Sequence, residues 1–182
     1  MRSFVRISFY ENSVVLTLAL LFAAACGDGS HSQATSPQSF ALRFQAVNAA
    51  QDVSCDKALL NLGTGKVKAQ LQDFALYIHG LTFIKADGTT VEATLETNEW
   101  QAENVALLDF QDKADSCLGE NKPTHVVIKG SIPNQEEFRA LRFTLGVPPH
   151  LNHVDPASVK APLNATHMFW SWQSGYKSMR LD

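Results

Sequence analysis

Short segments in which apolar and polar residues alternate are the feature that most restricts the fold of this chain. In residues 39–48, Phe40, Leu42 and Phe44 occupy every second position, with polar residues such as Arg43 between them. A two-residue period is typical of a β-strand with one face buried and the other in water. We therefore expect packed sheets rather than helices.

Further segments have the length and composition of strands and are separated by turn residues. The Asp87-Gly88 pair is a strong hairpin signal. The predicted strands are residues 71–84, 90–95, 105–110, 125–132 and 138–145, with the start of another at 175–182 and a short helix at 134–140. Several closely spaced strands without a long helical period predict an all-β fold, an antiparallel β-sandwich with long loops.

The first 25 residues have the pattern of a bacterial lipoprotein signal peptide. Arg2 and Arg6 precede an apolar run at residues 14–25, shorter than the roughly 20 residues that a membrane span needs. Small residues stand directly before Cys26, where signal peptidase would cut and lipid would be attached. The alternative is an ordinary signal peptide in which Cys26 has no such role. Acylation would anchor the protein in the bacterial cell envelope, in the periplasm or at the outer membrane.

Residues 26–38 are small and polar and predict a flexible, lipid-anchored tether, followed by one domain at residues 39–182. The chain has a formal net charge of −3, and removal of residues 1–25, whose net charge is +1, would leave −4. A mildly acidic domain without a basic stripe lacks the electrostatic features of nucleic-acid binding. We therefore expect no nucleic-acid partner.

Two cysteines remain once Cys26 is assigned to the anchor. In an oxidising compartment Cys55 and Cys117 are expected to form a disulfide. The alternative is two separate thiols. Neither cysteine belongs to a C-x-x-C motif, so a cysteine-rich zinc site is not expected.

Residues 146–177 combine potential metal ligands with residues that interrupt regular structure. The stretch contains three of the six histidines, two tryptophans, a methionine, four prolines and two glycines. Loops of this kind can be held out by a rigid scaffold for binding. Imidazole is a good ligand for copper and zinc, and thioether sulfur favours Cu(I). The composition therefore suggests a metal site.

Several long phrases resemble the MbnP-like family, the periplasmic copper-binding proteins also called metallo-mystery-pair four-cysteine proteins. The resemblance rests on VALLDFQD at residues 105–112, LRFTLGVPPHLNHVDP at 141–156 and APLNATHMFWSWQSGYKSMRLD at 161–182. Cys55, the strand at residues 74–78, the Asp87-Gly88 turn and Trp100 agree with it. The resemblance covers nearly the whole chain after the predicted signal peptide.

This resemblance implies a secreted β-sandwich that binds copper and is not an enzyme. In related proteins, histidine nitrogens bind the metal together with a tryptophan that has been oxidised to kynurenine. A partner protein, a dihaem c-type cytochrome similar to cytochrome c peroxidases, performs the oxidation. The ring-opened residue offers amine and carbonyl groups, whereas the nitrogen of an intact indole is only a donor.

Two departures from the family pattern indicate a C-terminally truncated member. The family is named for four cysteines, and its members continue for about another hundred residues, with a histidine-bearing segment and two more cysteines. Ser178 stands where the pattern would place an aromatic residue. A truncated member would have exposed strand edges, which promote aggregation.

His153 is the first choice as a metal ligand, with Asp155 as a carboxylate that can orient its second ring nitrogen. Trp170 and Trp172 share one face of an extended segment, and either is a candidate for the oxidised residue. Met168 falls on that face and is assigned to core filling, with a sulfur contact as the alternative. The alternative roles are a histidine bonded to backbone and tryptophans that only pack.

The other histidines are weaker candidates. His150 lies three residues before the first-choice ligand and can chelate with it, and His79 lies in a strand that can face the same site. His167 points away from that site in an extended segment. We assign His125, at the start of a strand, and Trp100, after a charged turn, to packing.

Two functions follow from these observations. The first is a membrane-anchored protein that binds copper for its acquisition or handling. The alternative is a metal-free lipoprotein β-sandwich that serves adhesion or assembly in the envelope. An enzyme is the weakest option, because the sequence has no G-x-S-x-G, no H-E-x-x-H and no cysteine beside a base.

Overall fold

The computed structural model describes residues 5–9, 36–112, 117, 123–133 and 137–182, and its regular structure is almost entirely β-strand. The strands are β1 Val5–Phe9, β2 Gln38–Asn48, β3 Gln51–Asp52, β4 Ala58–Leu62, β5 Val67–Gln70, β6 Phe74–Lys85, β7 Thr90–Glu92, β8 Thr94–Leu95, β9 Gln101–Ala102, β10 Val105–Asp109, β11 Val127–Ile132, β12 Phe138–Leu145, β13 Phe169–Ser171, β14 Gly175–Tyr176 and β15 Met179–Leu181. Two 3-10 turns, η1 Pro156–Ser158 and η2 Thr166–Met168, complete the described elements. The all-β prediction is confirmed.

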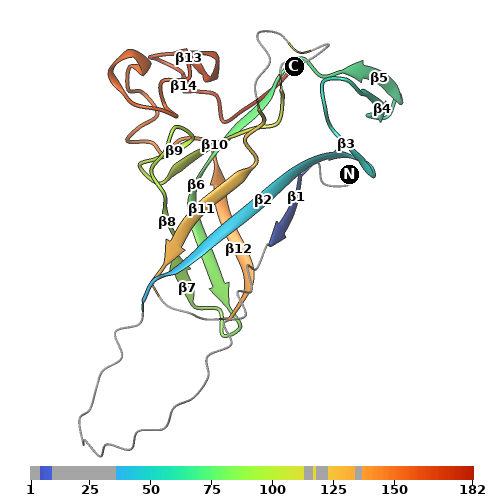
Figure 1. Cartoon of the computed structure of the whole chain (residues 1–182). Coiled ribbons are helices and arrows are strands. Elements are labelled where there is room, and N and C mark those ends of the chain that lie inside the picture. The colour runs from blue at the N-terminus through green and yellow to red at the C-terminus, as the bar shows by residue number, and fades with distance from the viewer. Residues whose placement is uncertain (1–4, 10–35, 113–116, 118–122, 134–136) are drawn as a thin grey trace, which may run out of the picture.

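The first sheet has the strand order β1-β2-β11-β8, and β3 pairs with the far end of β2. Both neighbours of β2, β1 and β11, run antiparallel to it. Leu42, Phe44 and Ala46 of β2 are buried and Arg43 is exposed, which confirms the predicted alternation. In Figure 1 the cyan β2 crosses in front of the second sheet.

The second sheet is built around β6. β12 and β15 pair with one edge of β6, β7 and β10 pair with the other, and β9 extends the sheet beyond β10; all pairs are antiparallel. Gly80 lies at φ +62°, opposite the point where the register of β12 shifts. This residue is therefore the bend expected for a glycine inside a long strand.

The two central strands of the second sheet, β6 and β10, are covered on both faces. Leu76 and Ile78 of β6 belong to the main core between the two sheets, while Tyr77 belongs to a second buried cluster on the outer face. Successive residues of β10 also alternate between the main core and the second cluster, and the whole strand is buried. Strands covered on both sides lose the alternation of exposed and buried residues, which explains their continuously apolar sequences.

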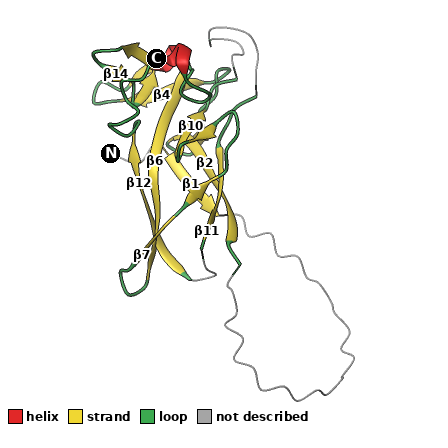
Figure 2. Ribbon diagram, turned by 90° about the vertical axis from the view of Figure 1, so that its left-hand side faces the viewer, coloured by secondary structure: helices red, strands yellow, loops and turns green. Residues whose placement is uncertain are grey.

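Residues 146–177, the C-terminal layer, cover part of this outer face. Leu163, Met168 and Tyr176 from the layer join Tyr77 and Val105 in the second cluster. β13 and β14 form a hairpin within the layer, at the end of the sandwich opposite β7 (Figures 1 and 2). The loops that sequence analysis singled out are therefore packed on a sheet and not simply exposed.

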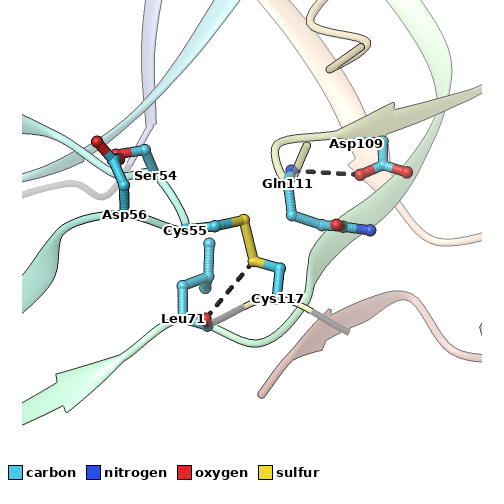
Figure 3. Close-up of a disulfide and its surroundings, with 7 residues drawn as sticks. All are labelled: Ser54, Cys55, Asp56, Leu71, Asp109, Gln111 and Cys117. Carbon is cyan, nitrogen blue, oxygen red and sulfur yellow. Dashed lines mark hydrogen bonds between the residues drawn. A yellow bond between two sulfur atoms is a disulfide. The ribbon is translucent and has the colours of Figure 1, made fainter. Parts of the chain in front are cut away.

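Cys55 and Cys117 form a disulfide, as predicted (Figure 3). Both residues are buried in the main core, and the sulfur of Cys117 lies 3.5 Å from the carbonyl oxygen of Leu71. The bridge joins positions 62 residues apart. Closing a loop of that length stabilises the fold by about 4 kcal/mol in the chain-entropy model.

The predicted single strand at residues 90–95 is two strands in two different sheets. The amide of Ala93 donates to the carbonyl of Leu81 in the second sheet, whereas Thr94 and Leu95 pair with β11 in the first. The chain therefore crosses from one sheet to the other at this point. The sequence of residues 90–95 does not reveal this switch, because both halves of the segment have strand-like residues.

The predicted helix at residues 134–140 is wrong for its described part, since Phe138 begins β12 and packs against Phe83 of β6. The tail at 175–182 is strand-like, as expected, but divides into β14 and β15. Residues 5–9 of the predicted signal peptide pair with β2 as β1. Its apolar run, Cys26 and tether residues 27–35 lie outside the described residues.

β12 and β15 have no partner on their outer edge within the described part of the chain. Leu145, Met179 and Leu181 lie along this edge and are 53%, 50% and 49% exposed. Their register partners on β6 are Ile78, Leu76 and Phe74, which are core residues. An unpaired edge with exposed apolar side chains favours pairing with other chains.

Candidate metal site

Two buried tyrosines hold the C-terminal layer on the sheet. The hydroxyl of Tyr77 donates to the carbonyl of Pro162 at 2.7 Å, and that of Tyr176 donates to the carbonyl of Leu163. The two rings meet edge to face, with centroids 5.7 Å apart. Burial raises the pKa of both phenols, so they stay protonated donors at neutral pH. The layer is therefore attached to β6 at a defined position.

His153 lies against the β13–β14 hairpin. Its Nδ1 is 2.8 Å from the carbonyl oxygen of Trp172. A carbonyl oxygen only accepts, so Nδ1 carries the proton and the neutral ring keeps its lone pair on Nε2. The residue is exposed, and Nε2 takes no part in this bond. A ring nitrogen bonded to backbone, with the other nitrogen free, is the usual arrangement of a metal-binding histidine.

Asp155 does not orient His153 as predicted. Its carboxylate accepts from the amide of Ala157 at 2.9 Å and caps η1. The carbonyl of Trp172 takes the orienting role in its place. Sequence spacing suggested the carboxylate, but the acceptor comes from the turn between β13 and β14, 19 residues further along the chain.

The two tryptophans of the hairpin are the most exposed large apolar residues described. Trp170 is 73% and Trp172 is 72% exposed. The ammonium of Lys177 lies 5.4 Å from the centre of the Trp170 ring, a cation–π distance. Met168 is fully buried in the second cluster, which confirms core filling as its role.

Three other histidines that sequence analysis named lie on or beside this layer. Nδ1 of His79 is 2.8 Å from the carbonyl oxygen of Gly146, so its Nε2 also keeps the lone pair. On β6 it pairs with Val105, a residue of the second cluster, and so lies on the side that the C-terminal layer covers. His150 is exposed in the turn before His153. His167 is half-buried, and its carbonyl accepts from the ammonium of Lys177.

Asn152 is a residue of this site that sequence analysis missed. Its side-chain oxygen accepts from the amide of Tyr176 at 3.0 Å, next to the point where His153 meets the hairpin. Gly175 packs so closely on Asn152 that a Cβ there would lie 2.4 Å from the asparagine side-chain nitrogen. The sequence offers only weak signals for this contact, an asparagine directly before the histidine and a glycine at the end of the hairpin.

A second histidine–tryptophan pair lies beside β10. The rings of His125 and Trp100 are stacked, with centroids 4.7 Å apart and planes 4° from parallel. Trp100 packs against the second cluster and donates its indole N–H to Glu99. Burial lowers the pKa of His125, and its Nε2 is buried with no hydrogen-bond partner among the described atoms. These contacts agree with the packing role assigned to both residues.

The donor atoms at His153 fit copper, but the described residues do not provide a complete ligand set of ordinary side chains. No group of three or more His, Cys, Asp or Glu that could hold a metal ion occurs among them. A neutral imidazole nitrogen is a good copper ligand. A site here would therefore need a donor of another kind or from another part of the protein.

The fold and this layer define the class: a disulfide-bonded β-sandwich that displays a histidine and two tryptophans on loops packed over one sheet. The chain belongs to the MbnP family, whose model matches residues 37–182. The matched region begins one residue before β2 and includes the whole C-terminal layer. No curated protein matches the chain.

The solved structures include one that is similar along most of the chain, MbnP from Methylosinus trichosporium. The TM-score is 0.69 at 28% sequence identity, and the match covers 81% of this chain. It covers 55% of the other chain, so this chain spans about half the length of that relative. None of the described helical turns is long and apolar enough to cross a membrane.

Proposed function

We propose that the protein is an extracytoplasmic copper-binding protein in which the imidazole of His153 and an oxidised tryptophan of the β13–β14 hairpin share the metal. Membership of the MbnP family supports copper handling. Trp172 is the first candidate for the oxidised residue and Trp170 the second. The protein is a carrier of copper in this proposal and not a catalyst.

The contact between His153 and Trp172 carries the proposal. It attaches an imidazole to the backbone of a tryptophan and leaves Nε2 of the imidazole available to a metal. An intact indole cannot be a ligand through its N–H, but kynurenine supplies an amine and a carbonyl. Oxidation would therefore create an additional metal-binding group, which the ordinary side chains of the described residues do not provide.

The exposure of the hairpin supports oxidation by a second protein. Trp170 and Trp172 each have more than two thirds of their surface in contact with solvent. A dihaem c-type cytochrome similar to cytochrome c peroxidases, the partner that the family resemblance implies, could reach either indole without unfolding the domain. Trp100, packed between His125 and the second cluster, offers much less access.

The position of the proposed lipid anchor would leave the hairpin accessible to such a partner. The start of β2, where the tether would join the domain, lies at the opposite end of the sandwich from the hairpin (Figures 1 and 2). Acylation at Cys26 would then hold the near end of the domain at a membrane. The tryptophan hairpin would point away from the lipid and towards partners in the envelope.

The alternative function is a metal-free lipoprotein β-sandwich for adhesion or assembly. The lack of a cluster of three ordinary metal-binding side chains among the described residues favours it. Under this alternative, the contacts of His153 and the hairpin are packing only.

A melting experiment distinguishes the two functions. A ligand that binds only the native state stabilises it, by about 2.7 kcal/mol at a free concentration of 100 Kd. The protein, produced together with its haem partner, should melt at a higher temperature with Cu(I), and His153→Ala should lose the shift. A wild-type protein with the same melting temperature with and without Cu(I) would establish the metal-free alternative.

A further inference from the structure

We propose that Asn152 is a positioning residue that fixes His153 against the β13–β14 hairpin and thereby selects the ring nitrogen offered to a metal. The copper part of this proposal rests on the proposed function. The selection of the ring nitrogen is a property of the metal-free protein and does not.

Asn152 and His153 connect one loop to two points of the hairpin. The side-chain oxygen of Asn152 accepts from the amide of Tyr176 at 3.0 Å. The next residue places its Nδ1 2.8 Å from the carbonyl oxygen of Trp172. Two adjacent residues thus bond to opposite ends of the hairpin turn, one as acceptor and one as donor.

The fit of Gly175 shows how closely the loop approaches. A Cβ at Gly175 would lie 2.4 Å from both the side-chain nitrogen and the carbonyl oxygen of Asn152. Gly175 also has φ +76°, where residues with a side chain are strained. Glycine therefore allows Asn152 to sit directly on the hairpin, and this contact places His153 next to Trp172.

His153 cannot hold this position without support. It is exposed, and among the described residues its side chain is held by the hydrogen bond from Nδ1. An exposed side chain held by one hydrogen bond loses rotamer freedom, and this loss offsets much of the small net stabilisation that such a bond provides. The neighbouring anchor supplies the missing restraint. The amide of Tyr176 holds the side chain of Asn152, and Gly175 packs against its carbonyl, so the backbone from which the histidine side chain starts is fixed.

Selection of the ring nitrogen follows from this restraint. While Nδ1 donates to the Trp172 carbonyl, the neutral ring has its lone pair on Nε2. A ring released from the carbonyl exchanges between both neutral forms and several rotamers. Loss of the asparagine oxygen should therefore reduce both the population of the Nδ1–H form and the affinity for copper.

The test begins with the metal-free protein at a pH where histidines are neutral. Imidazole ¹⁵N shifts, assigned with a His153→Gln variant, report which nitrogen of His153 is protonated. Wild type should show Nδ1–H, and so should Asn152→Asp, which keeps the oxygen acceptor. Asn152→Leu, similar in shape but without the oxygen, and Asn152→Ala should show a mixture of both forms.

The matched control is Asn164→Ala, which removes an exposed asparagine of the same layer and should leave the Nδ1–H form unchanged. Near-ultraviolet circular dichroism identifies which of the leucine and alanine variants is folded, and that variant gives the decisive spectrum. A folded variant without the oxygen that retains Nδ1–H as fully as wild type would overturn the positioning role.

Copper affinity provides the second arm. Removing a group that orients a metal ligand typically costs 10–100-fold in affinity, so the dissociation constant for Cu(I) should rise about 10-fold or more in Asn152→Leu but not in Asn152→Asp. An unchanged constant in the leucine variant would contradict the proposal. A wild type that binds no copper would instead refute the proposed function, while the ¹⁵N spectra would still decide the role of Asn152.

Discussion

Two histidine–tryptophan pairs occur in this protein, and they differ in how the rings meet. His125 stacks face to face on Trp100 beside β10, at 4.7 Å between centroids. His153 forms a hydrogen bond with the backbone carbonyl of Trp172, and the side chain of that residue is largely exposed to solvent. The same two residue types thus form a packed pair in one region and an open pair in the other.

The difference concerns which nitrogen and which ring are accessible. In the packed pair, burial lowers the pKa of His125 and encloses its Nε2. In the open pair, a backbone carbonyl engages Nδ1 of an exposed histidine, and Nε2 takes no part in that bond. Composition alone cannot distinguish a structural pair from a site, whereas the direction of the free nitrogen can. The predictions below test this distinction.

The largest difference should appear in copper binding. His153→Ala should weaken Cu(I) binding more than about 100-fold, because it removes a ligand and not merely a group that orients one. His125→Ala should leave the affinity within about 3-fold. Competition with a chromophoric Cu(I) chelator measures both constants. Equal losses in the two variants would mean that the packed pair also binds metal.

The stability of the contact between the β13–β14 hairpin and the loop that holds His153 should depend strongly on Gly175. Gly175→Ala introduces left-handed backbone strain and a contact of 2.4 Å with Asn152, so it should destabilise the protein by about 2 kcal/mol. Gly88→Ala is the matched control, since Gly88 also has positive φ (+87°) but has no atom within 4 Å of the added Cβ.

Urea unfolding measures both glycine variants, and the control should lose only about 1 kcal/mol, the cost of the backbone conformation. Equal losses in the two variants would show that Asn152 and the hairpin are not in close contact. Gly175→Ala should also shift the ring ¹⁵N signals of His153, whereas Gly88→Ala should not.

Accessibility of the indoles should separate the two pairs more modestly. Acrylamide should quench the fluorescence of Trp170 and Trp172 more efficiently than that of Trp100, since both hairpin indoles are more than 70% exposed. A Trp170→Phe/Trp172→Phe variant should retain only the weakly quenched, shorter-wavelength emission. If acrylamide quenched the emission of that variant as strongly as it quenches wild type, the packed geometry of Trp100 would be contradicted.

The smallest effect concerns pH and stability. The pKa of His125 is lower in the folded protein, so the unfolded chain binds more protons as the pH falls below the ordinary value of about 6.5. The contribution of neutral His125 is therefore fully present above that pH and is lost as the pH falls towards its folded pKa. His125→Phe, which can keep the stacking, should flatten the fall in melting temperature between pH 7 and 5. An unchanged slope would assign the pH dependence to other groups.

The strands could be predicted from the sequence because their signal is local. Alternation in residues 39–48 and the Asp87-Gly88 turn correctly indicated β2 and the hairpin between β6 and β7. The crossing at Ala93 could not be predicted, because it depends on a bond to Leu81 in another sheet. Local patterns define strands, but they do not define which sheet receives them.

The sequence indicated which residue types gather in the C-terminal layer but not how they are arranged there. The bond from Tyr77 to Pro162 joins residues 85 positions apart, and this bond helps to place the whole C-terminal layer. Asp155 was expected to orient His153, yet the carbonyl of Trp172 does so. Backbone groups are identical along a chain, so sequence patterns do not indicate which carbonyl a side chain will meet.

Peptide mass spectrometry tests the central claim most directly. The protein is produced with and without the proposed haem partner and digested, and the peptides that contain Trp100 and the Trp170–Trp172 pair are compared. We predict the mass change of kynurenine on the hairpin peptide only when the partner is present, with Trp100 unmodified. Intact indoles throughout, or oxidation confined to Trp100, would contradict the assignment of the hairpin as the copper site.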